Sequence, residues 1–529
     1  MLYLTNAFQS SITSNLTPYV TSEFEEHSLL TVINIVANSM AAAVYIPTAK
    51  LLDLWGRAEG FCVMVCFATL GLILMAVCKS LYTFCAAQVF YTIGFGGMIY
   101  CVDVITAYAS SLKHRGLAFA FISSPYIITA FAGPKSAEGF YNNVKNWRWG
   151  FGAFAIIVPF VAAPLFIILK LNLRKAKRAG VLAREKSGRT LFQNIIFYIR
   201  EFDGKSYNNR RRSPTNTYLA PGSFLLACGL VIFLLPFTLA DSAPNGWSTG
   251  YIIAMLVVGF VLLVLFGLHE RFTAQVPFLP FNLLLNRSIV GACLLSFTYQ
   301  ISYYAWYSYF TSFLQVVSNL TIAEAGYVSS TFDVLSGFLL LFCGFIISKT
   351  GHFRWLLFIA IPFYLLGQGL MIHFRQPDTS VGYLVMCQIF IAIGGSIIIL
   401  CEQLAVMAAA DHQHIAPVLA LLNIFGWLGG AVGNTISGAI WTNSFPQALA
   451  RLLPEEELAN LDSIYGDLTV QLSYERGSPT RLAIEQAYGI AQRRMLIAGT
   501  CVMCLTLIWV VLIKNYNVAK MQQTKGRVF

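Results

Sequence analysis

Long apolar segments recur along the whole chain and constrain its fold more than any other feature. Fourteen of them are long enough to form membrane-spanning helices. They cover residues 2–22, 28–50, 60–79, 81–108, 117–138, 150–171, 219–240, 249–268, 289–313, 325–347, 355–374, 381–407, 416–441 and 495–513. Only 11% of the 529 residues are charged, against about 25% in soluble domains. The sequence therefore predicts an all-α polytopic membrane protein and excludes a soluble cytosolic enzyme.

The first apolar segment begins directly at Met1, with no basic residues before it. This argues against a signal peptide, and a first span that lacks its first turns is one explanation of the abrupt start. The 12 cysteines are scattered through the chain, mainly in apolar runs, so no disulfide framework is expected. Cys501 and Cys504 form a CxxC pair, but neither a second pair nor a histidine is near, and we interpret them as packing residues rather than metal ligands.

Lysine and arginine are distributed unequally between alternate loops. Of the 35 basic residues, 25 fall in loops 50–60, 113–115, 170–212, 269–288 and 349–354 and in the tail after Lys514. Because positive charge is retained on the cytoplasmic side, both termini are predicted to lie in the cytoplasm. Segment 170–212 alone holds 13 basic and 3 acidic residues. Topology accounts for this charge and few aromatic residues accompany it, so no nucleic-acid partner is expected.

Two long polar segments organise the chain. The predicted parts are an N-terminal bundle (1–171), a basic cytoplasmic loop (172–218), two extra central spans (219–268), a C-terminal bundle (269–441), an extracellular loop (442–494), a last span (495–513) and a cytoplasmic tail (514–529). The extracellular loop is rich in tyrosine, which argues against disorder, and 481–495 is helix-like. Its candidate ligand contacts are Tyr465, Tyr474, Arg476 and Tyr488. It either caps a large ligand or simply tethers the last span.

The short loop between the second and third spans contains Asp-x-x-Gly-Arg. This resembles the signature loop of the major facilitator superfamily, although Ala49 and Ala58 replace the usual first glycine and final basic residue. A degenerate repeat occurs at 348–354. The resemblance implies a facilitator fold of two six-helix bundles plus the two extra spans. The residues of the implied conformational-gating motif are Lys50, Asp53, Gly56 and Arg57. Asp53 can cap a helix, and Gly56 permits a tight turn.

The fifth span contains Gly133-Pro134, which resembles a motif of proton-coupled exporters in the same superfamily. The expected flanking glycines are missing at Ala130 and Ala137. A proline kink that packs against a neighbouring helix is at least as good an interpretation.

Several longer runs are similar to the fungal siderophore-iron transporter family, and together they cover essentially the whole chain. They are residues 3–9, 45–60, 147–151, 402–407, 477–481 and 487–489. That family is a fourteen-span branch of the superfamily with a long outer loop before its final helix. The resemblance implies import of ferric hydroxamate siderophores driven by protons. It requires no cofactor, because the siderophore encloses the iron in its own oxygens.

Carboxylates inside the spans are functional candidates because burying them is costly. Asp103 and Glu402 lie on symmetry-related helices near their cytoplasmic ends, which favours proton coupling, although both could snorkel toward water instead. Asp333 is a further coupling candidate for which a structural role is the preferred interpretation. His412 lies in an inner loop with Asp411 and His414, where a proton relay or a solvated loop is favoured over metal binding.

The ninth span carries aromatic residues at three- and four-residue steps, which places them on one helical face. Such a stripe serves either packing or the binding of an amide-rich ligand, whose oxygens tyrosine hydroxyls can bond. The substrate-binding candidates here are Tyr299, Gln300, Tyr303, Trp306 and Tyr307, and those on the first span are Phe8 and Gln9.

These observations together predict a monomeric importer of a ferric siderophore, coupled to protons, in a plasma or endosomal/vesicular membrane. No enzymatic activity, cofactor or resident metal is expected. The alternatives are a fourteen-span proton-coupled drug exporter and an exchanger of a small peptide-like solute such as glutathione. A transporter-like nutrient sensor would need a much longer tail than 514–529.

Overall fold

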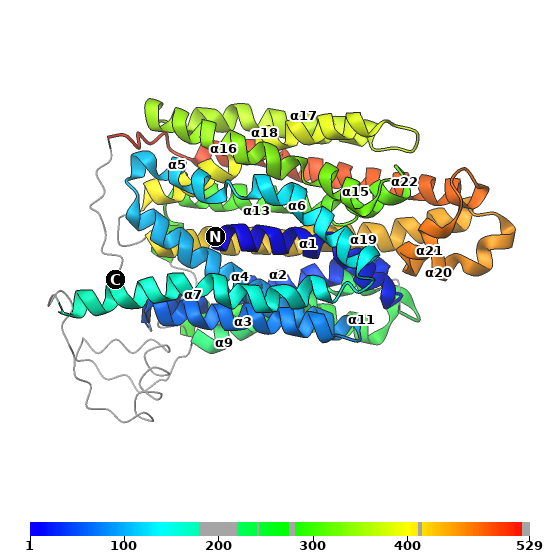
Figure 1. Ribbon diagram of the computed structural model, residues 1–529, viewed down its shortest axis with the longest axis horizontal. Coiled ribbons are helices and arrows are strands. Elements are labelled where there is room, and N and C mark those ends of the chain that lie inside the picture. The colour runs from blue at the N-terminus through cyan, green and yellow to red at the C-terminus, as the bar shows by residue number, and fades with distance from the viewer. Residues whose placement is uncertain (55, 179–218, 241–242, 274–280, 411–414, 521–529) are drawn as a thin grey trace, which may run out of the picture.

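The computed structural model describes residues 1–54, 56–178, 219–240, 243–273, 281–410 and 415–520. Regular structure in these ranges is entirely helical, and most helices run side by side in one elongated bundle (Figure 1). The α-helices are α1 (Leu2–Glu23), α2 (Leu30–Leu54), α3 (Arg57–Val77), α4 (Leu81–Ala109), α5 (Leu112–Ser123), α6 (Tyr126–Glu138), α7 (Trp149–Arg178), α9 (Leu219–Leu234), α10 (Pro236–Leu239), α11 (Gly250–Leu268), α12 (Phe281–Leu284), α13 (Arg287–Tyr307), α14 (Phe310–Val316), α15 (Ile322–Ser329), α16 (Thr331–Thr350), α17 (Arg354–Phe374), α18 (Val381–Ala409), α19 (Ile415–Leu452), α20 (Leu461–Gly466), α21 (Leu468–Ser473), α22 (Pro479–Met503) and α23 (Thr506–Leu512). Short single turns include η1 (His27–Leu29), η2 (Gly139–Asn143) and η6 (Glu455–Asn460).

Twelve helical segments in the described part of the chain are long and apolar enough to cross a membrane. The prediction of an all-α membrane protein is therefore confirmed. The predicted spans 2–22 and 289–313 are also helical, as α1 and as α13 with α14, but they are not among the twelve. Both carry many hydroxyl, amide and phenol side chains, which lower their hydropathy. These two helices therefore need a polar environment on one side.

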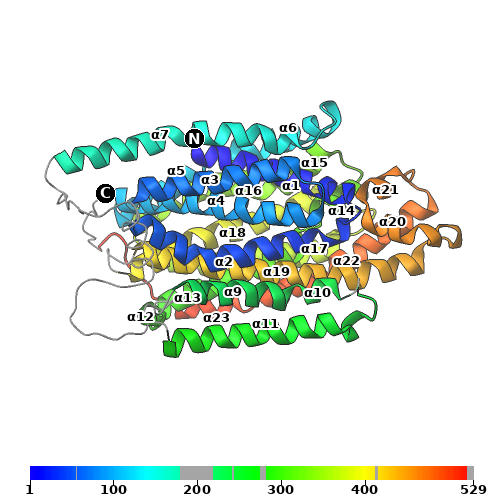
Figure 2. The same ribbon diagram turned by 90° about the horizontal axis from the view of Figure 1, so that it is seen from below.

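The helices form two halves that meet along the length of the bundle. In the N-terminal half, α1–α7, helix α3 packs on α4 and α7; in the C-terminal half, α13–α23, helix α13 packs on α19 and α22. Across the halves, α2 packs along α19, and α5 and α6 pack against α16 and α15. Helices α9 and α11 pack on each other at one edge of the bundle (Figure 2), and α9 also contacts α2.

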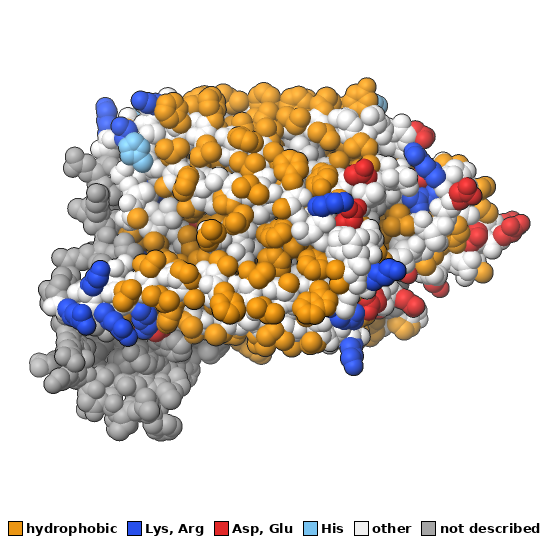
Figure 3. Space-filling model, viewed as in Figure 1, with side chains coloured by type: hydrophobic (Ala, Val, Ile, Leu, Met, Phe, Trp, Pro, Cys, Tyr) orange, Lys and Arg blue, Asp and Glu red, His pale blue; other side chains and the backbone are white. Residues whose placement is uncertain are grey.

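Apolar side chains cover much of the face of the bundle shown in Figure 3, between its two ends. Large apolar side chains of the helices are exposed, among them Phe121, Phe160 and Phe342 at 72%, 75% and 62%. Exposed apolar surface of this extent marks contact with an apolar environment, which for spanning helices is lipid. Acidic side chains gather at one end of the bundle, where α20 and α21 lie.

Glycine and proline allow close contacts between helices, both within the N-terminal half and across the halves. Gly133 of α6 lies against the Ser11 side chain of α1, and Pro134 lies against Gly326 of α15. A Cβ atom at Gly133 or Gly326 would overlap these neighbours. Close helix packing therefore accounts for Gly133-Pro134, as one of the two interpretations of this motif predicted.

We call residues 455–473, which comprise η6, α20 and α21, the cap, and the end of the bundle that carries it the cap end. Within the predicted loop over 442–494, α19 continues to Leu452 and α22 begins at Pro479, so both ends of this segment are helical. The apolar runs end at 441 and begin at 495, but the backbone hydrogen bonds of the helices extend beyond them. The helix-like stretch predicted over 481–495 is confirmed.

The cap contacts both halves. The Leu468 amide donates to Ser22 Oγ of α1 at 3.0 Å. Arg481 of α22 is 2% exposed; it donates to the Val316 carbonyl of α14 at 2.6 Å and also to the Gln471 carbonyl of the cap. Glu485 accepts from Arg481 Nε at 3.3 Å. The cap therefore lies across the seam between the halves.

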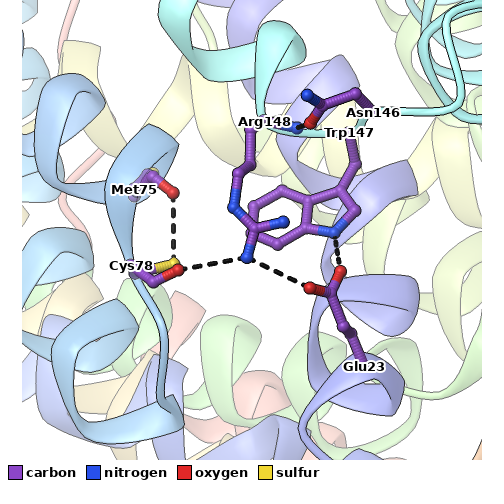
Figure 4. A network of polar contacts seen from close by, with 6 residues as sticks. All are labelled: Glu23, Met75, Cys78, Asn146, Trp147 and Arg148. Carbon is purple, nitrogen blue, oxygen red and sulfur yellow. Dashed lines mark hydrogen bonds and ion pairs between the residues drawn. The ribbon is translucent and has the colours of Figure 1, made fainter.

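A second polar network ties together the cap-end termini of three helices of the N-terminal half (Figure 4). Glu23, at the end of α1, accepts hydrogen bonds from Trp147 Nε1 and from Arg148 Nη2, the latter at 3.0 Å. The same guanidinium group donates to the Cys78 carbonyl, which follows α3, at 3.2 Å, and stacks over the Trp147 ring at 4.3 Å. This network anchors α1 to α3 and to the start of α7.

Candidate functional site

A cavity of about 460 Å³ lies between the two halves. Its volume is within the range of small-molecule sites, about 300–1,000 Å³. The lining residues are 6–7, 10–11, 13–15, 17–18, 30, 33–34, 37–38, 88, 91–92, 95–96, 99, 126, 129–130, 303–304, 307–308, 311, 329–330, 333 and 427. They belong to α1, α2, α4 and α6 of one half and to α13–α16 and α19 of the other.

Contacts between the halves lie on both sides of this cavity. Toward the cap end, the Tyr19 hydroxyl donates to Gln315 Oε1, and the Tyr309 hydroxyl donates to the Ser28 carbonyl at 2.7 Å. Toward the opposite end, the Tyr100 hydroxyl donates to the Ala416 carbonyl at 3.0 Å. His114 Nδ1 and Ser348 Oγ are 3.1 Å apart there. For the cavity to open at one end, the contacts between the halves at that end must separate.

Breaks in two predicted spans lie on the cavity wall, and a third break lies directly beside it. Helix α13 ends at Tyr307 and α14 begins at Phe310, while Ser330 separates α15 from α16. Between α5 and α6 the break includes Pro125. Interrupted helices expose backbone groups that a regular helix would use internally, and they are common around binding sites of membrane transporters.

The cavity wall is rich in amides and hydroxyls, most of which sequence reasoning missed. Amide side chains come from α1, α2 and α4, and they are Asn6, Asn15, Asn34, Asn38 and Gln88. Tyrosines on the wall are Tyr91, Tyr126, Tyr303, Tyr304 and Tyr307. The signal in the sequence was the density of uncharged polar residues in α1 and the Asn34/Asn38 spacing of four, which places both on one helical face.

The predicted aromatic stripe faces more than one environment. Tyr303 and Tyr307 line the cavity with their rings stacked 4.6 Å apart, and Ser329 Oγ donates to the Tyr307 hydroxyl at 3.1 Å. Tyr299 is buried against Tyr364 with ring centroids 5.4 Å apart. Residues at three- and four-residue steps spread over a wide arc of a helix, so the edges of such a stripe face different neighbours.

The other predicted binding residues lie away from the cavity. Gln300 lies near Gly426 and Gly429 of α19. Phe8 lines a separate apolar pocket and packs edge-on against Phe154 at 5.4 Å. Gln9 is fully buried and donates to Thr13 Oγ1 at 3.1 Å.

Trp306 is fully buried beside an arginine that sequence reasoning missed. Arg375, which follows α17, is also fully buried. Its guanidinium carbon lies 5.4 Å from the Trp306 ring, 4.3 Å from the Phe310 ring and 5.1 Å from the Phe313 ring. The guanidinium group also donates to the Trp306 carbonyl at 3.4 Å. This carbonyl lies in the last turn of α13, where a cation is favourable.

The three predicted acids occupy three different environments. Asp333 lines the cavity from the first turn of α16, so the preference for a purely structural role does not agree with its position. Asp103 accepts a hydrogen bond from the Tyr3 hydroxyl. Glu402 is buried within the C-terminal half and accepts from Ser296 Oγ at 3.1 Å, while its Oε2 atom has no hydrogen-bond partner among the described residues. His412 lies outside the described residues.

The signature loop is described in part. Gly56 has a φ of +96°, a conformation that favours glycine, as the predicted tight turn requires. The Arg57 guanidinium carbon lies 4.8 Å from the Tyr108 ring. In the degenerate repeat, Gly351 likewise has a positive φ of +71°. Lys50 and Asp53 lie in α2, but their side chains are outside the described part of the structure.

The four predicted outer-loop residues differ in accessibility. Tyr488 is fully buried and donates to Gln471 Oε1 at 2.8 Å, so it stabilises the cap and is not available to a ligand in this structure. Tyr465 is half-buried, and its ring packs against Phe445. Arg476 is exposed.

Tyr474 belongs to a polar cluster at the surface of the cap end. Hydrogen bonds from Asn460 at 2.9 Å and Tyr474 at 2.8 Å lower the pKa of the Glu457 carboxyl. Burial and this carboxylate raise the pKa of Tyr474. Tyr474, which directly follows the cap, is therefore bound to Glu457 near the start of the cap.

Within the described ranges, no group of three or more His, Cys, Asp or Glu residues is arranged to hold a metal ion. All 12 cysteines are free, and Cys501 and Cys504 are exposed. A polar cavity between two helical halves, with contacts between the halves at either end, is the arrangement of a membrane transport protein.

Comparison with known proteins agrees with this class. The model of the Major Facilitator Superfamily matches residues 1–434. The chain is 59% identical to the siderophore iron transporter mirB of Emericella nidulans, with 100% of this chain and 85% of that protein covered. It is 55% identical to the MFS siderochrome iron transporter D of Aspergillus fumigatus, over 100% of this chain and 86% of that protein. The chain thus belongs to the siderophore iron transporter family of the major facilitator superfamily.

Solved structures support the fold. A bacterial homologue of the human lysosomal transporter Spinster has a TM-score of 0.53 at 14% identity and covers 97% of this chain and 94% of its own. The human organic anion transporter MFSD10 has a TM-score of 0.54 at 11% identity, with 95% and 97% covered. At such low identity the likeness concerns the fold alone.

Proposed function

We propose that this chain imports a ferric hydroxamate siderophore together with protons, by alternating access across a plasma or vesicular membrane. The observation that carries the proposal is the cavity wall of amides, hydroxyls and aromatic rings. Amides and hydroxyls can donate to hydroxamate oxygens and accept from the peptide-like linkers of a siderophore, while rings cover its apolar parts. Relatives named as siderophore or siderochrome iron transporters, at 59% and 55% identity, support a siderophore as the cargo.

The proposed topology has fourteen spans and both termini in the cytoplasm. In this arrangement α1 and α13 cross the membrane with their polar faces on the cavity, which explains their low hydropathy. The cap end then faces outside, and the basic loops face the anionic inner leaflet. The proposed unit is a monomer, because the cavity is formed by one chain.

Proton coupling is proposed to depend on Glu402 and Asp103. Both are carboxylates within long helices, and in the described part of the chain each accepts from one side-chain donor, Tyr3 for Asp103 and Ser296 for Glu402. Burying a carboxylate with so few partners is costly, and a bound proton offsets that cost. Neither lines the cavity, so a proton and the cargo would bind at separate places and be linked through the motion of the halves.

The proposal is tested by uptake of iron-55 in cells that lack other siderophore carriers. We expect accumulation of ferric hydroxamates that collapses when a protonophore dissipates the gradient. Accumulation that survives the protonophore would contradict coupling. A drug-exporter or glutathione-exchanger activity would instead appear as outward transport of those solutes with no hydroxamate uptake.

Tyr303→Ala should raise the apparent transport constant about fivefold or more, since truncating an aromatic anchor commonly costs more than about 1 kcal/mol. The residue lines the cavity and its ring stacks on Tyr307. Initial rates measured over a range of siderophore concentrations give the constant. Tyr82→Ala, at a tyrosine that is 87% exposed, is the matched control. Unchanged kinetics with less protein in the membrane would support the packing role instead.

A further inference from the structure

Among the described residues that line the cavity, the charged side chain is acidic and none is basic. The wall contains a carboxylate, Asp333, and no lysine, arginine or histidine among the described residues that line it. Around it are uncharged donors and acceptors, together with five tyrosines and Trp427. A ligand inside this cavity therefore meets negative charge and aromatic faces, and no basic side chain from the wall.

Asp333 is free to interact with a ligand. It is half-buried, and in the described part of the chain its carboxylate forms no ion pair or hydrogen bond. Tyr126, Tyr303 and Tyr307 line the same cavity as Asp333. As the third residue of α16, it lies where the helix dipole favours a negative side chain.

Two independent features of the wall thus favour positive charge. A carboxyl group with no partner ionises readily when an ammonium group lies beside it, and the two then attract each other strongly where water is scarce. Tyrosine and tryptophan rings attract cations through their negative faces. A carboxylate on the ligand would have the opposite effect, because it would lose its hydration without gaining a basic partner.

We propose that Asp333 is a specificity-determining residue that selects the ferric siderophore by net charge. Chelates that carry a free ammonium group are preferred over neutral ones, and chelates that carry a free carboxylate are rejected. This inference rests on the proposed siderophore transport and assigns Asp333 a role separate from that of Glu402 and Asp103.

The test uses one linear ferric trihydroxamate with three forms of its terminal amine. The free amine gives a net charge of +1, acetylation gives 0 and succinylation gives −1, while the iron shell stays the same. Iron-55 uptake and mutual inhibition are measured for the wild type and for Asp333→Asn. The wild type should prefer the forms in the order +1, 0, −1. In Asp333→Asn, uptake of the +1 form relative to the neutral form should fall about tenfold, and that of the −1 form should rise.

Asp378→Asn is the matched control, since this aspartate is exposed between α17 and α18 and its positive φ of +65° is one that asparagine also adopts. This variant should leave unchanged the uptake of the +1 form and of the −1 form, each relative to the neutral form. Equal loss of all three forms in Asp333→Asn would overturn the proposal in favour of a coupling or structural role. If that variant does not reach the membrane, a wild-type order other than +1, 0, −1 in mutual inhibition overturns it. Failure of the wild type to take up the neutral form would instead contradict siderophore transport itself.

Discussion

Glu402→Gln is expected to abolish uphill accumulation of the siderophore while exchange of internal for external siderophore continues. The carboxylate is 5% exposed, and its only described hydrogen bond comes from Ser296. Glutamine has nearly the same shape and can accept that bond, so the packing of α18 is kept. It cannot bind and release a proton, so the gradient no longer drives transport, and the ratio of internal to external cargo should fall to unity.

Counterflow in proteoliposomes and accumulation in energised cells separate these two activities. Glu324→Gln is a suitable control, because Glu324 is exposed and glutamine preserves the capping box that it forms with Thr321. This variant should accumulate siderophore normally. Normal accumulation by Glu402→Gln at neutral outside pH would remove Glu402 from the coupling mechanism.

Arg481→Ala should strongly destabilise the folded protein. This buried side chain joins the cap, α14 and Glu485. Removing one partner of a buried pair commonly costs about 3–5 kcal/mol, because the other charge stays buried without compensation. We expect a lower melting temperature in detergent and less folded protein at the membrane.

Arg476→Ala is the control: it also removes a positive charge, five residues earlier in the sequence, but from an exposed position. It should leave the melting temperature nearly unchanged, since exposed charges contribute little to stability. The double variant Arg481→Met/Glu485→Leu should recover part of the loss, because it leaves no unpaired charge. A melting temperature for Arg481→Ala equal to that of Arg476→Ala would show that the cap is held by other contacts.

The positions of the long helices could be predicted from the sequence because they follow the apolar runs, and each predicted range coincides with one helix or two consecutive helices. Helix ends beyond the membrane could not be predicted in this way. Residues 442–452 and 479–494 are polar enough to end an apolar run, but they continue as helix and pack with the cap. Tyr488 illustrates the result: its sequence suggested an exposed contact, and tertiary packing buried it.

The cavity was harder to predict than the spans. Periodicity identified the helix face that contains Tyr303 and Tyr307, but it could not separate these two residues from Tyr299. Residues of α17 and α18 cover Tyr299 and keep it away from the cavity, and the sequence does not show which edge of the stripe they cover. Asp333 and Glu402 are both acids within long helices. Only the contact between the two halves determines that Asp333 lines the cavity while Glu402 is enclosed within the C-terminal half.

The position of α9, α10 and α11 has a consequence for how the halves can move. At one point Thr31 of α2, Thr238 of α10 and Gly438 of α19 meet so closely that glycine alone fits at 438. Helices α9 and α10 therefore bridge the α2–α19 seam, which joins the two halves on that side. Any motion that separates α2 from α19 must therefore move α9 and α10 away from one of these two helices.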